Sequence, residues 1–353
     1  MTSQNPDLAE LGWTSFFASQ TTADCVERAI PARVMAVHRG LINIAGDGFE
    51  ETIASHLDDA CTDKDYPTVG DWLLIERHAR RPLRLLGRRS LFFRRAPGSG
   101  RRLQLIAANV DTLFIVSSCN ADFNIARLER YLVLAREAGV TPVVVLTKAD
   151  IADAPEDYAA KARGLQSGLL VETVNALDPG DIGSLSAWCG KGQTVAFVGS
   201  SGVGKSTLIN TLTGAQDIAT KGIREDDSRG RHTTTGRQMH RLAEGGWLLD
   251  TPGMRELQLT DAASGIESVF EDIVALAAQC RFADCSHDGE PGCAIREALD
   301  TGTLDAERYR RWHKLAAEEA FNSATLSERR ARDKAFGKMV KSVMKDKQRD
   351  KRR

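Results

Sequence analysis

Apolar positions between residues 105 and 256 follow two alternating patterns. Short continuous apolar runs, typical of buried strands, are separated by segments whose apolar residues recur at helical spacing. The pattern predicts strands near residues 111–117, 142–147, 169–174, 193–198 and 246–250 and helices near 125–138, 156–166 and 205–213. Alternating strands and helices indicate an α/β domain with a mostly parallel sheet, which binds ligands beyond the carboxyl ends of its strands.

The regions on either side of this domain have different patterns. Before it, β-rich runs at 33–37, 41–44 and 71–75 are separated by glycines. Several short strands within about 65 residues predict a small barrel, of the OB-fold or SH3-like type. OB barrels commonly bind RNA, but a purely structural barrel explains the pattern equally well. After the domain, residues 305–320 and 327–346 predict helices, and the second of these is basic and amphipathic.

Basic charge is concentrated in two segments of this 353-residue chain, although its net charge is only −1. Residues 77–102 contain ten arginines and no acid, and residues 329–353 contain twelve Lys or Arg against three Asp. Phe92 and Phe93 lie between arginine pairs, which suits phosphate contact combined with base stacking. We therefore favour a nucleic-acid partner, and a solvated linker and tail are the alternatives. No apolar run approaches the roughly 20 residues of a membrane span, so we expect a cytoplasmic protein.

A glycine-rich loop follows the predicted strand at 193–198 and precedes the helix at 205–213. In this context it predicts a P-loop, whose backbone N–H groups converge on a phosphate at a helix N-terminus. Lys205 would reach the β- and γ-phosphates, and Ser206 would hold Mg²⁺. The predicted nucleotide-binding residues of the loop are Gly199, Ser200, Ser201, Gly202, Val203, Gly204, Lys205, Ser206 and Thr207.

Two loops before the P-loop have the features of a guanine-reading site. Thr147, Lys148 and Asp150 belong to a Thr-Lys-Ala-Asp sequence at the end of a predicted strand. The Asp150 carboxylate would accept hydrogen bonds from the ring N–H and the exocyclic amine of guanine, and the Lys148 stem would cover the purine. Adenine offers no such pair of donors. After the next strand, Asn175 and Ala176 hold the place of the loop whose backbone amide binds guanine O6.

Further residues that would bind Mg²⁺ and the γ-phosphate are expected after the P-loop. Asp250 begins a D-x-x-G sequence, in which it would be an outer ligand of Mg²⁺ and the Gly253 N–H would sense the γ-phosphate. Thr234 and Thr235 lie in a polar loop whose hydroxyls would close on Mg²⁺ and the γ-phosphate.

Met254 stands where Ras-like GTPases have a water-orienting Gln, and a thioether cannot orient water. We therefore expect His232 to position the attacking water, with Lys205 and Asp250 as the other catalytic residues. The alternative is that His232 only packs the loop or contacts RNA.

The order of these elements is unusual, because the base-reading loops precede the P-loop instead of following the D-x-x-G sequence. A site depends on spatial arrangement and not on chain order, so the domain is predicted to be circularly permuted. Further along, Cys280, Cys285, His287 and Cys293 have the spacing Cys-x4-Cys-x-His-x5-Cys. Three thiolates and an imidazole form a complete tetrahedral set for one structural Zn²⁺, and reduced free cysteines are the alternative.

The sequence resembles the RsgA (YjeQ/EngC) family of circularly permuted GTPases that depend on the small ribosomal subunit. The resemblance covers roughly nine-tenths of the chain and rests on these sequences: Leu11-Gly12-Trp13, Ala107-Ala108-Asn109-Val110-Asp111, Thr147-Lys148-Ala149-Asp150, the P-loop, Gly230-Arg231-His232-Thr233-Thr234-Thr235, Asp250-Thr251-Pro252-Gly253 and the cysteine cluster. In two places the chain departs from the family pattern: Thr147 replaces the commoner Asn, and Asn175 replaces the usual Ser.

The resemblance implies an N-terminal OB-fold, a GTPase core, a C-terminal zinc subdomain and a role in late maturation of the 30S subunit. We therefore expect an extension at 1–30, a barrel at 31–96, a permuted P-loop GTPase domain at 97–260 and a helical zinc-binding region at 261–353. The expected partners are GTP and GDP, the 30S subunit and its 16S rRNA, with no membrane and with the protein as a monomer. A non-catalytic, nucleotide-sensing RNA-binding module is the alternative, and intact Lys205, Ser206 and Asp250 argue against it.

Overall fold

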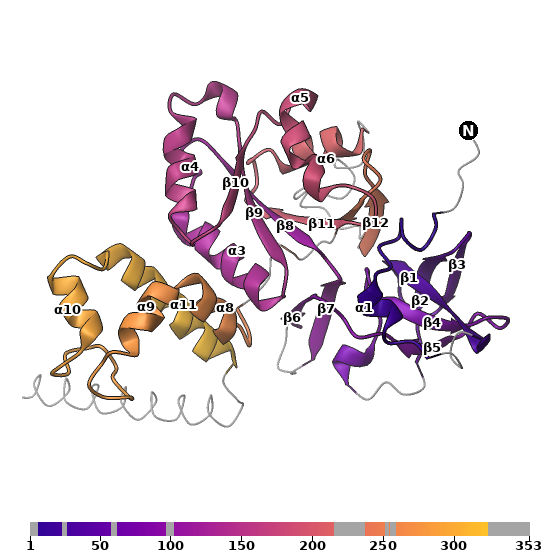
Figure 1. The fold of residues 1–353 in the computed structure, drawn as a ribbon, viewed down its shortest axis with the longest axis horizontal. Coiled ribbons are helices and arrows are strands. Elements are labelled where there is room, and N and C mark those ends of the chain that lie inside the picture. The colour runs from indigo at the N-terminus through magenta and orange to yellow at the C-terminus, as the bar shows by residue number, and fades with distance from the viewer. Residues whose placement is uncertain are drawn as a thin grey trace, which may run out of the picture.

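One sheet of 11 strands runs through the barrel and the α/β region (Figure 1). The structure is a computed structural model that describes residues 6–22, 27–57, 62–96, 102–214, 237–250, 254 and 259–323. Along the main path of the sheet the strands follow the order β10-β9-β8-β11-β13-β12-β1-β2-β3. Strand β4 pairs with β1, and β5 pairs with β4. A separate hairpin pairs β6 with β7. The strands are β1 (Ala29–Val37), β2 (Leu41–Gly46), β3 (Phe49–Ala54), β4 (Trp72–Glu76), β5 (Pro82–Leu85), β6 (Leu91–Arg95), β7 (Leu103–Ala108), β8 (Thr112–Ser118), β9 (Thr141–Thr147), β10 (Leu170–Thr173), β11 (Thr194–Gly199), β12 (Arg237–Arg241) and β13 (Trp247–Asp250).

The α/β region confirms the predicted strands and helices. Strands β10, β9, β8, β11 and β13 are parallel, and β12 pairs antiparallel with β13. Helix α3 (Ile125–Glu137) begins where the Asn124 side chain accepts from the Arg127 N–H, and α4 (Pro155–Arg163) begins with proline at its first turn. The P-loop helix α6 (Lys205–Thr213) ends at Gly214, whose φ of +66° suits glycine. The short helix α5 (Pro179–Ile182) completes this part, and the short helix α1 (Ser15–Ala18) lies beside the barrel, where Phe17 packs on Trp72.

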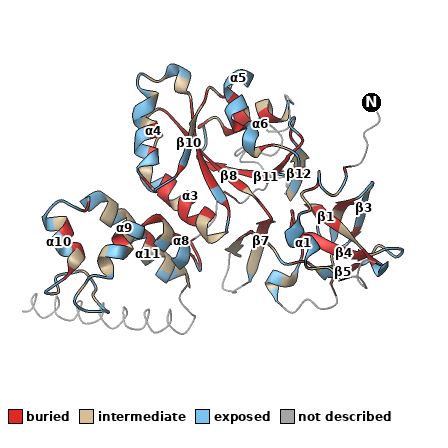
Figure 2. Cartoon of the chain, in the orientation of Figure 1, coloured by how far each residue is buried: buried red, intermediate tan, exposed pale blue. Residues whose placement is uncertain are grey.

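Both faces of the parallel sheet are covered, which explains why its strands are continuous apolar runs. On one face Leu113 and Ile115 pack in the same cluster as residues of α3 and of the C-terminal helices. On the other face Phe114 and Val116 pack with Leu208 of α6. Successive side chains of β8 thus enter opposite cores, as the period of two requires. Figure 2 colours most of β8 and β11 as buried.

The predicted barrel is present, and it contains strands that the sequence pattern did not indicate. Strands β1, β2 and β4 match the three predicted runs, and β3 and β5 complete an antiparallel order β3-β2-β1-β4-β5. Its interior is a small cluster that includes Val34, Ile42 and Leu73. The order is that of an OB-fold.

A buried arginine fills the junction between the barrel and the α/β sheet. The guanidinium of Arg33, on β1, donates to the carbonyl oxygens of Leu11 and Asn109 and, at 2.8 Å, to Thr194 Oγ1 at the start of β11. Arg33 is only 2% exposed, and burial lowers its pKa to about 10. This side chain therefore links the N-terminal segment, the barrel and the P-loop strand.

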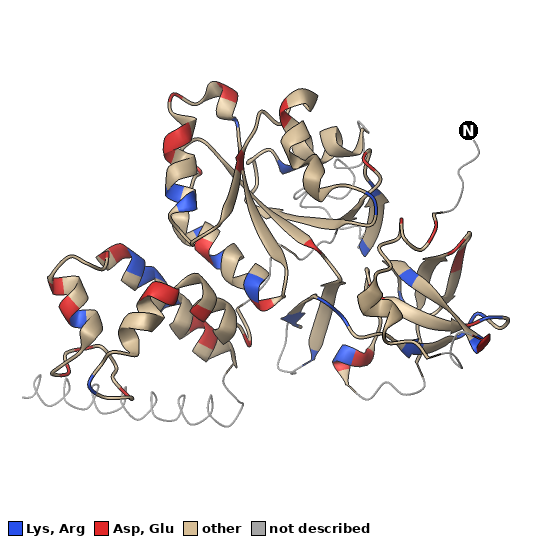
Figure 3. Cartoon of the chain, in the orientation of Figure 1, with Lys and Arg blue, Asp and Glu red and all other residues tan. Residues whose placement is uncertain are grey.

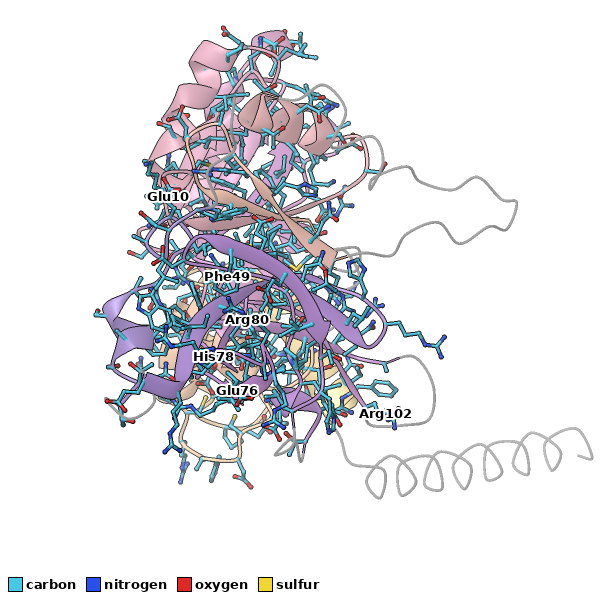
Figure 4. All side chains as sticks on the ribbon, turned by 90° about the vertical axis from the view of Figure 1, so that its right-hand side faces the viewer. Glu10, Phe49, Glu76, His78, Arg80 and Arg102 are labelled. Atoms are coloured by element: carbon cyan, nitrogen blue, oxygen red, sulfur yellow. The ribbon has the colours of Figure 1, made fainter. Side chains whose placement is uncertain are left out.

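The arginine-rich stretch at 77–102 differs from the expected linker. It contains strands β5 and β6, and acids from elsewhere in the chain neutralise several of its arginines. Figure 3 marks the basic and acidic positions of the described chain. Figure 4 looks onto the barrel, where Arg80 lies close to Phe49, its cation–π partner. The ion pairs are Arg80–Glu51, Arg81–Glu76, Arg88–Asp71 and Arg89–Asp111. Arg88 is 10% exposed, and two of its nitrogens donate to the buried Asp71 carboxylate at 2.7 Å. The charge of Arg88 is therefore neutralised inside the protein.

The C-terminal helices dock onto α3 through ion pairs. The helices are α8 (Ala263–Val269), α9 (Glu271–Ala277), α10 (Ala294–Asp300) and α11 (Ala306–Ser323). Glu129 of α3 is fully buried and accepts from Arg311 Nε at 2.7 Å and from Arg308 Nη1 at 3.4 Å. Helix α11 confirms the predicted helix at 305–320, whereas the one at 327–346 lies outside the described residues. None of the helices described here combines the length and the apolar character that a membrane crossing requires.

Candidate nucleotide site and metal centre

The predicted nucleotide-binding loops that the structure describes lie at one edge of the sheet. Because β9, β10, β11 and β13 are parallel to β8 or to one another, their carboxyl ends lie on the same side. The Thr-Lys-Ala-Asp loop follows β9, the loop with Asn175 follows β10 and the P-loop follows β11. Asp250 is the last residue of β13. The permuted order of the motifs therefore assembles an ordinary ligand-binding edge.

The P-loop requires glycine at specific places. Gly199 has φ +147°, and a Cβ atom there would lie 2.3 Å from the Val116 carbonyl oxygen of the neighbouring strand. Gly204, at the N-terminus of α6, has φ +87°. These glycines let the chain turn sharply so that the helix N-terminus opens onto the loop, where its dipole favours an anion.

Lys205 lies within the loop. It is 7% exposed, and its Nζ donates to the Gly199 carbonyl at 2.7 Å and to the Ser200 carbonyl. The ammonium is thereby held at the mouth of the loop where a phosphate group would bind. Ser206 and Thr207 follow in the first turn of α6, both half-buried.

Thr147 joins the base-reading loop to the P-loop. Its side chain is fully buried, and Oγ1 donates to the Val203 carbonyl oxygen at 2.6 Å. Its hydroxyl is therefore used within the protein, at the place where the family commonly has Asn. Lys148 then adopts a left-handed conformation with φ +60°, and Asp150 is exposed on the 3₁₀ turn that follows. The carboxylate that we expect to read guanine is thus open to a ligand.

The loop after β10 is fixed by side chains on both sides. Asn175 Oδ1 accepts from the Leu177 N–H at 3.0 Å, and Asp181 Oδ2 accepts from the Asn175 N–H at 2.9 Å. Thr211 of α6 donates to the Ala176 carbonyl at 3.0 Å, which ties this loop to the P-loop helix. Sequence reasoning did not identify Asp181 or Thr211, because only the fold brings them to this loop.

Some of the predicted catalytic and nucleotide-binding residues lie outside the described residues. This holds for His232, Thr234, Thr235 and Gly253. For Asp250 the backbone is described, and it lies opposite Gln238 in the β12–β13 ladder. Met254 is described and is 3% exposed.

The predicted zinc ligands come together as a compact cluster. The ligand atoms of Cys280, Cys285, His287 and Cys293 all lie within 4.8 Å of one another. His287 Nδ1 is 3.6 Å from the Cys280 sulfur and 3.5 Å from the Cys293 sulfur, and these two sulfurs are 4.0 Å apart. Ligands of a tetrahedral Zn²⁺ are separated by about 3.5–3.8 Å, so the geometry and the thiolate-rich donor set both fit zinc.

Glu290 organises the loop between two of these ligands. Its carboxylate accepts from the Ser286 hydroxyl and from the N–H groups of Ser286 and Asp288, at 2.9 and 3.0 Å. The hydrogen bond from the Ser286 hydroxyl is the main reason that the pKa of Glu290 falls to about 2. The sequence pattern gave no indication of this role, because Glu290 looks like an ordinary loop residue.

The fold and the site define a circularly permuted P-loop GTPase with a Cys₃His cluster that fits a metal ion. Residues 85–260 match the family described as RsgA GTPase. The chain is 49% identical over 349 residues to the small ribosomal subunit biogenesis GTPase RsgA 2 of Vibrio parahaemolyticus, covering 98% of this chain and 95% of that protein. It is 52% identical over 332 residues to RsgA of Mesorhizobium japonicum, covering 93% of this chain and 94% of that protein.

Solved structures show the same fold at lower identity. YjeQ from Thermotoga maritima superposes with a TM-score of 0.58 at 22% identity, covering 81% of this chain and 97% of that one. YloQ, described as a circularly permuted GTPase, gives 0.57 at 22% identity, covering 84% and 97%. With the sequence identities above, the chain belongs to the RsgA family of GTPases.

Proposed function

We propose that this protein hydrolyses GTP to GDP and phosphate and that it acts in the biogenesis of the small ribosomal subunit. The observation that carries the proposal is the hydrogen bond from Thr147 to Val203, which holds a guanine-reading sequence against a P-loop. A P-loop alone would leave the base undetermined. The family relatives of nearly equal length carry the ribosomal role in their names.

Each site residue has a proposed task. Asp150 accepts from the guanine N–H groups, Lys148 covers the base and the Ala176 N–H donates to guanine O6. The P-loop amides and Lys205 bind the β- and γ-phosphates. Ser206 would hold Mg²⁺, with Asp250 as an outer ligand. The loop with Thr234 and Thr235 would close its hydroxyls on Mg²⁺ and the γ-phosphate, and the Gly253 N–H would sense the γ-phosphate. The Mg²⁺ supplies neutralisation of the charge that develops on the phosphates.

Water activation needs a group other than the residue after the D-x-x-G sequence. Met254 holds that place and is buried, so it offers neither a polar atom nor access to solvent. We propose that His232 positions the attacking water, because an imidazole can orient or accept a proton near neutral pH.

The regions outside the nucleotide site would attach the protein to the ribosomal subunit. We propose that one structural Zn²⁺ binds Cys280, Cys285, His287 and Cys293 and shapes the 261–353 region. The barrel at 31–96, the arginine-rich stretch at 77–102 and the zinc subdomain would contact the 16S rRNA of the 30S subunit. The GTPase domain at 97–260 would then be stimulated when the protein, as a monomer, binds the subunit late in its maturation.

The test is phosphate release from GTP, measured with and without purified small ribosomal subunits. We expect slow release by the protein alone and a strong increase with subunits. His232→Ala should keep GTP and subunit binding and lose about 100-fold of the stimulated rate, as for a positioned proton-transfer group. A parent protein that binds GTP and the subunit but releases no phosphate would instead be a non-catalytic RNA-binding module. Parental stimulated turnover by His232→Ala would exclude His232 from catalysis.

A further inference from the structure

Strand β12 has two different neighbours in the sheet. On one edge it pairs antiparallel with β13, the strand that ends at Asp250. On its other edge it pairs with β1, the first strand of the barrel (Figure 1). β12 is therefore the one strand, among the described residues, that lies between the barrel and the phosphate end of the nucleotide site.

The register makes this contact specific. Gln238 lies opposite Asp250 on β13 and opposite Ala36 on β1. Arg237 lies opposite Val37 at the end of the same short ladder. These two residue pairs form the ladder between β12 and the barrel, so a small displacement of β1 would act directly on Gln238, the backbone neighbour of Asp250.

The Arg237 side chain adds a third attachment. Its Nη1 donates to the carbonyl oxygen of Leu105 on β7, which is half of the β6–β7 hairpin. On the paired strand, Arg94 Nε donates to the side chain of Gln104 at 2.9 Å, one residue from Leu105. Burial lowers the pKa of Arg237, and the positive charge of Arg94 lowers it further.

These contacts place Arg237 between the surfaces that we expect to bind RNA and the strand end that carries Asp250. The barrel and the β6–β7 hairpin, which carries Arg94 and Arg95, are the surfaces that we expect to contact rRNA, and β12 contacts the barrel through β1 and the hairpin through Leu105. An RNA phosphate near Arg94 would also attract Arg237, because both side chains are cationic. The next residue along the same strand, Gln238, lies opposite Asp250 on β13.

We propose that β12 couples docking of the barrel on rRNA to GTP hydrolysis, with Arg237 as its positioning residue. The inference rests on the proposed function, since it concerns the stimulated rate. Arg237 touches neither nucleotide nor reacting atoms in this scheme. Its bond to the Leu105 carbonyl fixes the first residue of β12 to the hairpin. A displacement of the barrel or the hairpin on RNA would therefore also displace the end of β13 at Asp250.

The experiment compares Arg237→Met with Arg237→Lys and with Arg241→Met as a matched control. Arg241 lies at the opposite end of β12, opposite Trp247, and its guanidinium pairs with Glu10 at 3.1 Å. It therefore shares the strand and the residue type but not the contact with the hairpin. Phosphate release is measured at a series of subunit concentrations, which separates the maximal stimulated rate from the affinity for the subunit.

For Arg237→Met we expect the rate without subunits, the affinity for GTP and the affinity for the subunit to stay within about twofold of the parent, and the maximal stimulated rate to fall about tenfold. Arg237→Lys keeps a donor for the Leu105 carbonyl and should recover most of that loss. Arg241→Met should behave as the parent.

Three results would overturn the coupling role. If Arg237→Met keeps the parental maximal rate, the bond between Arg237 and the hairpin is not required for stimulation. If it loses subunit affinity with the maximal rate intact, Arg237 is only an RNA contact. If the rate without subunits falls equally, Arg237 is only a structural residue. A parent protein that subunits do not stimulate would refute the proposed function itself, and this control is read first.

Discussion

Replacing Glu129 with Gln tests how the C-terminal helices are held on the GTPase domain. The substitution keeps the size of the side chain and removes the charge between Arg308 and Arg311. Breaking a buried ion pair by removing one partner costs about 3–5 kcal/mol, because the other charge remains uncompensated. Here the cost should be lower, since Arg308 keeps two bonds to Asp272 at 2.7 and 2.8 Å and the Arg311 side chain is 21% exposed. We expect a loss of about 2–3 kcal/mol in the free energy of unfolding.

The measurement is urea unfolding followed by circular dichroism, with Glu318→Gln as the matched control. Glu318 also joins α11 to α3, through Arg130, but both side chains are about one-third exposed, at 30% and 31%. An exposed pair of this kind contributes about 0–1 kcal/mol. If Glu129→Gln costs no more than Glu318→Gln, burial does not determine the strength of this contact, and the reasoning fails.

Three further predictions concern the ligands. Asp150→Asn should weaken GTP binding by about 1.5–3 kcal/mol through loss of a charge-assisted hydrogen bond and should improve binding of XTP; an unchanged GTP-over-XTP preference in a fluorescence titration would remove Asp150 from the site. Cys285→Ser should abolish stoichiometric zinc and increase amide exchange across the C-terminal helices, because metal binding is coupled to folding; a parent protein without zinc by elemental analysis would contradict this. Replacing Arg89, Arg94 and Arg95 with Ala should weaken subunit binding and lower its salt slope by about 0.7–0.9 for each RNA phosphate that an arginine no longer neutralises; parental slopes would show that these side chains do not touch RNA.

The positions of the nucleotide-binding motifs could be predicted from the sequence because each motif follows a buried strand. A run such as Val143–Leu146 has no polar positions, which in a parallel sheet fixes both the strand and the place where it ends. The cysteine cluster could be predicted for a similar reason, since ligand spacing is local. Its side chains come together without any distant part of the chain.

The roles that depend on distant partners could not be predicted. Arg88 is one of ten arginines in a segment without acids, and only the fold shows that Asp71 neutralises it. Glu129 lies on a helix whose pattern suggests an ordinary polar position, and its partners are about 180 residues away. The β6–β7 hairpin was missed because Leu91–Arg95 contains few alternating positions and is rich in charge, which favours an exposed connection in sequence reasoning.

The pairing of β1 with β12 has a consequence for the synthesis of the protein. Ala36 and Gln238 are neighbours in the sheet, but about 200 residues of chain separate them. At a translation rate of about 5–20 residues per second, β1 is made roughly 10–40 s before its partner. Over that interval the end of the first barrel strand has an unpaired edge, which is a template for association with other chains. The junction between the two halves of the molecule is therefore closed only after most of the GTPase region has left the ribosome, and it is the step of folding at which newly made chains should depend most on protection from aggregation.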